Sequence, residues 1–157
     1  MIGRAVGFGF AAARDGIARG LVRAGVTPNG LSLAGLVLTG GAALCYALGA
    51  GGTFAWSLSA GEGNCYVLLA GVLLLLASAC DMLDGAVARI GASKTAFGGF
   101  LDSTLDRISD FLVYIGIALG FARRDPANLT FVLLVLLAVC NAQMISYAKA
   151  RAEDFIS

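Results

Sequence analysis

The sequence predicts an all-α integral membrane protein with an N-terminal interfacial helix and four transmembrane helices. Of its 157 residues, 59% are hydrophobic and 13% are charged, and the mean hydropathy of +0.86 lies far outside the range of soluble domains. Its apolar runs approach the roughly 20 residues that cross a bilayer. Lysine and arginine gather at alternate ends of these runs, as in membrane proteins. This length favours one domain over residues 1–157, with residues 27–157 as the transmembrane bundle.

Residues 1–24 have the pattern of an amphipathic helix. Apolar residues recur at steps of three and four, and most arginines fall on the opposite side of a helical wheel. The four arginines of this stretch are Arg4, Arg14, Arg19 and Arg23. The pattern favours a helix that lies in the membrane interface. A signal peptide is the alternative, but its apolar run would be short and Arg14 would interrupt it.

The first two spans follow. Thr27 is a suitable N-cap and Pro28 a suitable first helical residue, and residues 29–49 carry no charge. Glycines at 49, 51 and 52 end this span. After a loop whose only charge is Glu62, a second apolar run begins at Tyr66.

The third span includes acidic residues. The charge-free residues 111–122 are too few to cross a bilayer, so this span must also include residues 97–110. It then carries Asp102, Asp106 and Asp110 to or below the level of the lipid headgroups. Residues 126–148 form a fourth, uncharged span.

The distribution of basic residues predicts the orientation. With a cytoplasmic N-terminus, nine of the 11 lysines and arginines lie on the cytoplasmic side, and only Arg123 and Arg124 lie outside. Residues 81–110, which hold five of the ten acidic residues, then lie at the cytoplasmic surface. The net charge of +1 gives no reason to expect a nucleic-acid partner.

The spacing of these acidic residues predicts a metal site. Asp81 and Asp84 share one helix face, as do Asp102 and Asp106. The short break at residues 91–96 predicts an antiparallel hairpin that brings the two pairs together. Four such carboxylates repel one another unless a cation binds. The chain has no histidine and its cysteines lack paired spacing, so the ligands favour Mg²⁺, Mn²⁺ or Ca²⁺, with room for two ions.

Nearby residues extend this prediction to a phosphate ligand. Gly85 and Gly98 leave room beside the metals for a phosphate-bearing ligand, and Arg89 is placed to pair with a phosphate. These features fit chemistry on a diphosphate at a membrane surface. The structural alternative is that the aspartates form ion pairs with Arg89, Lys94 and Arg107. Asp110 either continues the acidic stripe or hydrogen-bonds to another helix.

A family resemblance rests on eight positions within residues 81–106. They are Asp81, Asp84, Gly85, Ala88, Arg89, Gly98, Asp102 and Asp106. Together they resemble the complete signature of the CDP-alcohol phosphotransferases, also called CDP-alcohol phosphatidyltransferases. Thr27, Pro28 and Asn29 at the start of the first span are also similar to that family. The resemblance extends from about residue 24 to the end of the chain.

The resemblance implies a metal-dependent enzyme of phospholipid biosynthesis, commonly a homodimer. It would transfer a phosphatidyl-type group from CDP-diacylglycerol, or a similar CDP-alcohol, to a hydroxyl acceptor and release CMP. The implied positions are Asp81, Asp84, Asp102 and Asp106 for Mg²⁺ or Mn²⁺, and Asp84, Gly85, Ala88, Arg89 and Gly98 for the CDP-alcohol. Asp106 would also be the general base that takes the proton of the acceptor hydroxyl.

The acceptor is expected to be a phosphorylated polyol such as inositol phosphate. Residues 146–153 resemble a stretch of bacterial phosphatidylinositol phosphate synthases, which implies that Lys149, Arg151 and Thr95 contact the acceptor. Lys149 and Arg151 also suit ordinary positive-inside anchors. Phosphatidylglycerophosphate synthases, which act on glycerol phosphate, are an alternative because their acceptor is phosphorylated too.

The chain departs from the family in its number of spans. Family members usually have six, so we expect either a fragment, a shortened reading frame or a partner that supplies the rest.

Two other classes of membrane protein are alternatives to this family. A membrane prenyltransferase also uses paired aspartates and Mg²⁺ but does not need Gly85, Ala88, Arg89 and Gly98 at these positions. A non-enzymatic cation transporter usually has its site near the midplane of the membrane.

Overall fold

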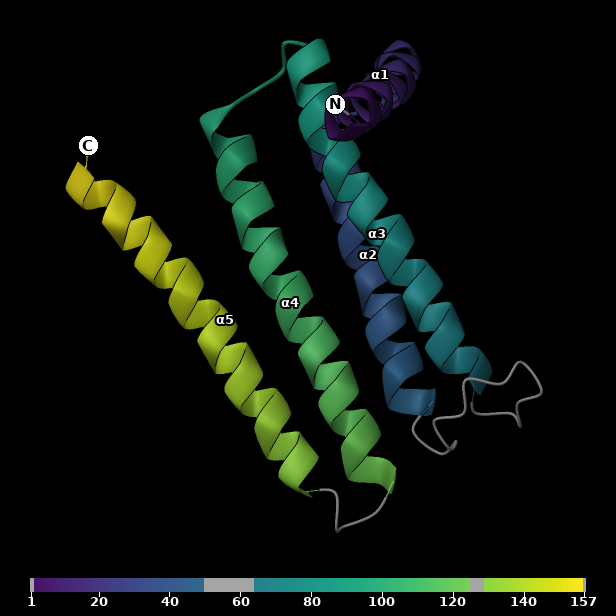
Figure 1. Ribbon diagram of the computed structural model, residues 1–157, viewed down its shortest axis with the longest axis vertical. Helices are drawn as coiled ribbons and strands as arrows, with labels where there is room; N and C mark the ends of the chain where they lie inside the picture. Colours follow the sequence, from purple (N-terminus) through teal and green to yellow (C-terminus); the bar gives the residue numbers. More distant parts are fainter. Residues whose placement is uncertain (1, 50–63, 125–128, 157) are drawn as a thin grey trace. The chain divides into compact units, whose positions relative to one another are not determined.

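The protein is all-helical in a computed structural model that describes residues 2–49, 64–124 and 129–156 (Figure 1). Its helices are α1 (Ile2–Arg23), α2 (Pro28–Leu48), α3 (Asn64–Ile90), α4 (Ala96–Arg124) and α5 (Leu129–Ile156). The described residues contain no strand, and the predicted all-α fold is confirmed. The predicted glycine-rich end of the first span at residues 50–52, the loop charge Glu62 and the start of the fourth span at residues 126–128 lie outside the described residues.

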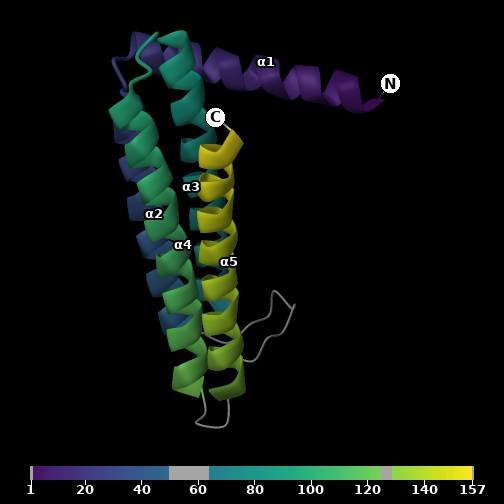
Figure 2. The ribbon, with the colours of Figure 1, turned by 90° about the vertical axis from the view of Figure 1, so that its left-hand side faces the viewer.

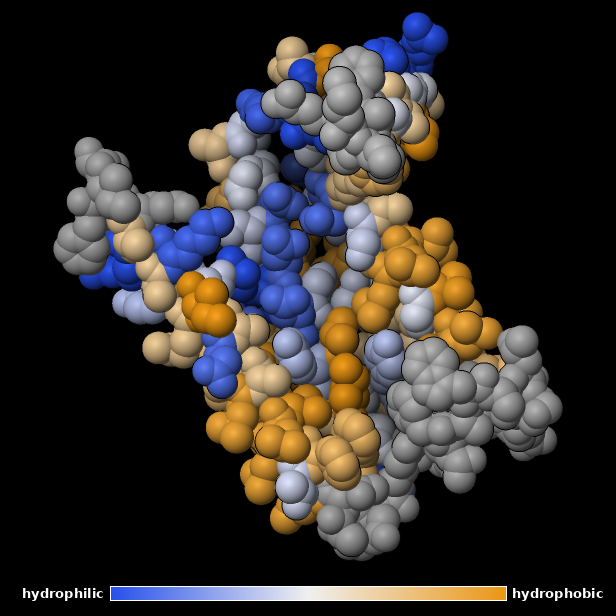
Figure 3. Space-filling view, viewed as in Figure 1, coloured by the Kyte–Doolittle hydropathy of each residue, from blue (hydrophilic) through white to orange (hydrophobic). Residues whose placement is uncertain are grey.

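Three of the described helices are long and apolar enough to cross a membrane. These segments are Pro28–Leu48, Cys65–Ile90 and Leu129–Ala152. Many of their large apolar side chains are exposed, such as Leu75 at 73% and Ile145 at 71%, and they contribute to the orange areas of Figure 3. α4 has 29 residues but is not among the three, because its first half carries four charged residues, Asp102, Asp106, Arg107 and Asp110. The protein is therefore an integral membrane protein with one helix of mixed character.

The helices divide into two compact units, each built from parts of several helices. The first unit comprises Met1–Leu38 and Leu74–Asp106, and the second comprises Thr39–Leu73 and Arg107–Ser157. The prediction of a single domain over residues 1–157 stays a prediction.

In the first unit, α1 packs against the end of α3. Ala18 of α1 and Ala86 and Val87 of α3 are buried together, with Leu21, Val22 and Leu31 packed around them. Figure 2 shows α1 lying crosswise to α3. α1 ends at Arg23, and Gly25 in the turn after it has a left-handed φ of 77°, which suits glycine. Phe10 and Ile17 of α1 remain exposed, and the position of this helix in the membrane interface stays a prediction.

α2 and α3 approach each other closely in the same unit. A Cβ atom at Gly35 would lie 3.5 Å from the Ala77 carbonyl oxygen and 3.6 Å from Cys80 Cβ, so only a small residue allows this spacing. The Gly30 amide donates a hydrogen bond of 3.2 Å to Thr27 Oγ1. This bond confirms Thr27 as the N-cap and Pro28 as the first residue of α2.

A short turn joins α3 to α4. The Ser93 amide bonds to the Ala88 carbonyl oxygen at 3.1 Å, and Ala92 has a left-handed φ of 49°, which together close the C-terminus of α3. Thr95 Oγ1 accepts a 2.9 Å hydrogen bond from the Gly98 amide and so caps the start of α4. The predicted break between the two helices is confirmed.

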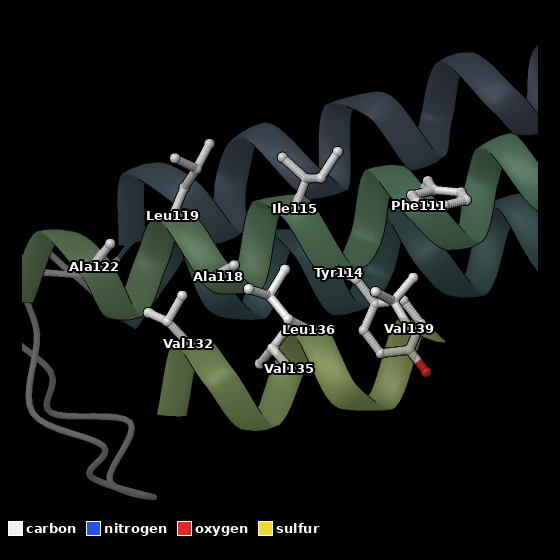
Figure 4. Close-up of a pocket in the computed structure, with 10 residues that line it drawn as sticks. All are labelled: Phe111, Tyr114, Ile115, Ala118, Leu119, Ala122, Val132, Val135, Leu136 and Val139. Atoms are coloured by element: carbon white, nitrogen blue, oxygen red, sulfur yellow. The ribbon is translucent and has the colours of Figure 1, made fainter. Parts of the chain in front are cut away.

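The second unit packs mainly through small and apolar residues. A Cβ atom at Gly116 of α4 would lie 2.7 Å from Ala43 Cα of α2, so these backbones are in direct contact. Arg123 Nη1 donates a 3.2 Å hydrogen bond to the Ala47 carbonyl oxygen near the end of α2. α4 and α5 enclose an apolar groove of about 270 Å³, which includes Ile115 and Leu136 (Figure 4).

Candidate functional site

Three aspartates of the first unit converge between α3 and α4. Asp81 of α3 and Asp102 and Asp106 of α4 each offer a carboxylate oxygen, and these oxygens lie within 4.8 Å of one another. Asp102 and Asp106 are four residues apart and therefore share a helix face. The turn before α4 places that face opposite Asp81. Figure 3 shows hydrophilic residues in blue over the upper half of α4.

Asp84 lies apart from these three. It is only 5% exposed, and its Oδ2 accepts a 2.5 Å hydrogen bond from the Ser32 hydroxyl of α2. Residues three apart on a helix differ by about 60° in direction, so Asp81 faces α4 while Asp84 faces α2. Asp84 is nevertheless close enough to Asp81 and Asp102 for their charges to repel it. The sequence suggested four carboxylates around one volume; three of them meet there and the fourth bonds to Ser32.

Three of the carboxylates, those of Asp81, Asp84 and Asp102, lack ion pairs of the kind that the sequence left open, as far as the described residues show. Within the described residues, Arg14 and Asp15 form an ion pair at 2.7 Å, and no ion pair joins Asp81, Asp84 or Asp102 to a basic side chain. Like charges this close to one another repel unless a cation lies between them. Oxygen ligands favour hard divalent cations. The donor set therefore fits Mg²⁺ or Mn²⁺.

Gly85 leaves open space beside the aspartates. A Cβ atom there would meet only Arg89 Nη1, at the ordinary contact distance of 3.8 Å. Packing therefore does not require glycine at this position, whereas a ligand close to the backbone would. Asp81, Gly85 and Arg89 follow one another at steps of four residues and share one face of α3. Ala88 is half-buried beside them.

Local packing at the start of α4 explains why residue 98 is a glycine. A Cβ atom at this position would lie 3.0 Å from Thr95 Oγ1 and 3.6 Å from Asn29 Oδ1. The first contact is tighter than side chains normally make, because Thr95 is held in place as the cap of α4. Glycine therefore permits the start of α4 to pack in this way, whether or not a ligand binds there.

The residues expected to contact the acceptor belong to different units. Thr95 lies in the first unit and is exposed, whereas Lys149 and Arg151 lie on α5 in the second unit and are also exposed. Their common role stays a prediction. Asp110 is exposed, belongs to the second unit and is not part of the group of three carboxylates.

Sequence reasoning missed Ser32 and did not place Asn29, although both are polar residues of α2 that approach the motif. Ser32 binds Asp84, and the side chain of Asn29 lies beside Gly98. The available signal was their spacing, since residues three apart share a helix face in a run that is otherwise almost wholly apolar. That signal identifies a polar face but does not say which helix it meets.

Comparisons with known proteins identify the family of this chain. The model of the CDP-alcohol phosphatidyltransferase family matches residues 26–154. Archaetidylinositol phosphate synthase of Methanothermobacter thermautotrophicus is 45% identical over 100 residues, which are 64% of this chain and 48% of that protein. Phosphatidylinositol phosphate synthase of Mycobacterium tuberculosis H37Rv is 37% identical over 150 residues, which are 92% of this chain and 59% of that protein.

Two crystal structures of the Mycobacterium tuberculosis phosphatidylinositol phosphate synthase are also similar. The one with CDP-DAG bound has a TM-score of 0.71 and 32% identity, and the match covers 90% of this chain and 63% of that one. The complex with manganese and citrate has a TM-score of 0.72 and 32% identity, and the match covers 90% and 60%. The chain thus spans about half to three-fifths of the length of these relatives. The match over residues 26–154 shows that it belongs to the CDP-alcohol phosphatidyltransferase family.

Proposed function

We propose that this chain carries the site of a CDP-alcohol phosphotransferase. It would transfer a phosphatidyl-type group from CDP-diacylglycerol, or a similar CDP-alcohol, to a hydroxyl acceptor and release CMP. The observation that carries the proposal is the convergence of Asp81, Asp102 and Asp106 within 4.8 Å, in a hairpin that holds all eight positions of the family signature. Similar structures that contain CDP-DAG or manganese support it.

The aspartates suit one or two divalent ions. Asp81, Asp102 and Asp106 would hold Mg²⁺ or Mn²⁺, with Asp84 as the fourth carboxylate. A bound ion would supply positive charge to neutralise the diphosphate and the departing CMP. Asp81 and Asp102 have no basic partner among the described residues, so their charge is available for this role.

The remaining residues bind and orient the CDP-alcohol. The proposed set is Asp84, Gly85, Ala88, Arg89 and Gly98. The open space at Gly85 admits a ligand backbone, and the exposed guanidinium of Arg89 is a bidentate donor for phosphate oxygens. Both lie on the helix face that also carries Asp81.

Asp106 is the proposed general base. It takes the proton of the acceptor hydroxyl while the acceptor oxygen forms a bond to the lipid-linked phosphorus. The bond between that phosphorus and the CMP oxygen breaks, and CMP leaves with the bonding electrons. Asp106 is exposed, so an acceptor can reach its carboxylate.

The proposed acceptor is a phosphorylated polyol such as inositol phosphate, contacted by Thr95, Lys149 and Arg151. The names of the similar proteins, which are phosphatidylinositol phosphate and archaetidylinositol phosphate synthases, support this choice. Glycerol phosphate is the alternative. Parallel assays of CMP release with each acceptor separate the two, and release that is faster with glycerol phosphate would contradict the proposal.

The site is proposed to lie on the cytoplasmic side of a homodimer. The predicted topology places nine of the 11 lysines and arginines on one side of the membrane, and such an excess is typical of the cytoplasmic side. Labelling of single introduced cysteines in intact cells and in inverted vesicles measures the orientation. Crosslinking in the membrane measures the oligomeric state, and a chain that is only monomeric would contradict the homodimer.

The central experiment measures CMP release by the full chain in lipid nanodiscs with CDP-diacylglycerol, Mn²⁺ and inositol phosphate. Asp106→Asn should lower turnover by about 100- to 10,000-fold because the general base is lost, while CDP-lipid binding stays largely intact. The matched control is Asp110→Asn, one turn further along α4 and outside the three carboxylates. Undiminished turnover by the Asp106 variant would contradict the assignment, and pyrophosphate release from a prenyl diphosphate would favour the prenyltransferase.

A further inference from the structure

We infer that Ser32 of α2 is a positioning residue for the metal site, because its hydroxyl holds the Asp84 carboxylate in place. The inference rests on the proposed function, in which Asp84 is the fourth carboxylate. Ser32 lies outside residues 81–106, which contain the family signature. It would thus extend the site to a helix that the signature does not include.

The contact between Ser32 and Asp84 is close and sheltered. Ser32 Oγ lies 2.5 Å from Asp84 Oδ2, across 52 residues of sequence. Asp84 is only 5% exposed, so water has little access to replace this donor. A buried carboxylate needs a hydrogen-bond donor, and Ser32 provides one.

The fold holds Ser32 in place from both directions along α2. Thr27 caps the start of the helix, and Gly35, one turn after Ser32, lies against Ala77 and Cys80 of α3. Leu31 packs against the buried core residues of α1 and α3. Since α2 and α3 run antiparallel, this register brings Ser32 opposite Asp84.

The serine hydroxyl has a restricted set of positions. Its oxygen lies 3.2 Å from the Pro28 carbonyl oxygen and 2.5 Å from Asp84 Oδ2. The single hydroxyl proton favours the charged and closer acceptor. The hydroxyl therefore aims at the carboxylate, and the carboxylate in turn is held in one orientation.

The neutral charge of a hydroxyl makes it a suitable hydrogen-bond donor beside a metal site. An arginine or lysine at this position would add a positive charge and weaken the attraction of Asp84 for a cation. Serine donates a hydrogen bond without changing the net charge. Partners that orient metal ligands in this way typically contribute about 10- to 100-fold to metal affinity.

The test measures Mn²⁺ affinity of the full chain in nanodiscs, without CDP-lipid, by titration calorimetry. Ser32→Ala should bind Mn²⁺ about 10- to 100-fold more weakly, and Ser32→Thr, which keeps the hydroxyl, should restore most of the affinity. Ser78→Ala is the matched control, because Ser78 is an exposed serine of α3. Equal Mn²⁺ affinities in the Ser32→Ala and Ser78→Ala proteins would overturn the inference.

A loss of folding is distinguished from a loss of positioning. Ser32→Cys keeps nearly the same volume but offers only a weak S–H donor, so it should also bind Mn²⁺ more weakly while its helical circular dichroism is unchanged. Mn²⁺ affinity equal to the wild type in that folded variant would likewise overturn the inference.

Parallel measurements of CMP release separate this inference from the proposed function. A wild-type chain whose Mn²⁺ affinity depends on Ser32, but which releases no CMP from CDP-diacylglycerol, would refute the function alone. A wild-type chain that releases CMP, with a Ser32→Ala variant of unchanged Mn²⁺ dependence, would refute the role of Ser32 alone.

Discussion

The two units of the molecule hold their helices together in different ways. In the first unit, polar contacts join the helices or cap their ends, as in the bond from Ser32 to Asp84 and the cap at Thr95. In the second unit, the backbones of α2 and α4 touch at Ala43 and Gly116, and α4 and α5 enclose an apolar groove.

This difference indicates which contacts serve helix packing and which residues serve a functional site. Small residues that let backbones touch are an ordinary means of packing helices in a membrane, where lipid removes the hydrophobic driving force between them. Polar and charged groups are costly there and mark functional sites. The first unit accepts this cost at Asp81, Asp84, Asp102 and Asp106. We therefore expect substitutions of these aspartates to affect chemistry, and substitutions at the close backbone contact of the second unit to affect stability.

The largest expected effect is at Asp102. Asp102→Asn removes one of the three converging carboxylates, and Mn²⁺ affinity should fall by more than the roughly 100-fold that is typical of residues around a ligand. Titration calorimetry measures this affinity, and CMP release should fall with it. A variant that binds Mn²⁺ like the wild type would show that the convergence is not a metal site.

The next largest effect is expected at Gly116, in the second unit. In Gly116→Ala the new methyl group would lie 2.7 Å from Ala43 Cα, and no flexible side chain can move aside. The free energy of unfolding should fall by about 1–3 kcal/mol, as measured by denaturant titration in detergent. Gly71→Ala is the control, because a Cβ atom at Gly71 meets nothing within 4 Å. Equal stability of the two variants would contradict the close approach.

Gly85→Ala should have a smaller effect, on binding rather than on folding. The added methyl group meets only Arg89 Nη1 at 3.8 Å, so the free energy of unfolding should not decrease. If a ligand occupies this space, the KM for CDP-diacylglycerol should rise about tenfold, which corresponds to about 1.4 kcal/mol. Gly99→Ala, at an exposed position with open space, should leave KM unchanged. An unchanged KM in both variants would show that the space at Gly85 is not used.

The smallest effect is expected at Thr95. Thr95→Ala removes the hydroxyl that caps α4 and should lower the free energy of unfolding by about 1 kcal/mol, whereas Thr95→Ser should retain it. The KM for inositol phosphate, measured in both variants, tests the second role of this residue. A higher KM in the alanine variant with no change in stability would favour acceptor binding over capping.

Much of the architecture could be predicted because its signals are local. Thr27 and Pro28 mark the start of α2 through a cap and a fixed backbone angle. The polar break before Thr95 separates α3 from α4. The spacing of Asp102 and Asp106 places both on one helix face. Each of these features depends on residues within about one helical turn of one another.

Only the tertiary structure decided how those faces meet. It separated Asp84 from the other three carboxylates and paired it with Ser32, and it brought Gly116 against the backbone of Ala43. The sequence alone could not show this, because the rotation and register of one helix against another depend on packing between residues far apart in the chain. Local spacing therefore determined which residues share a face, and helix packing determined what each face contacts.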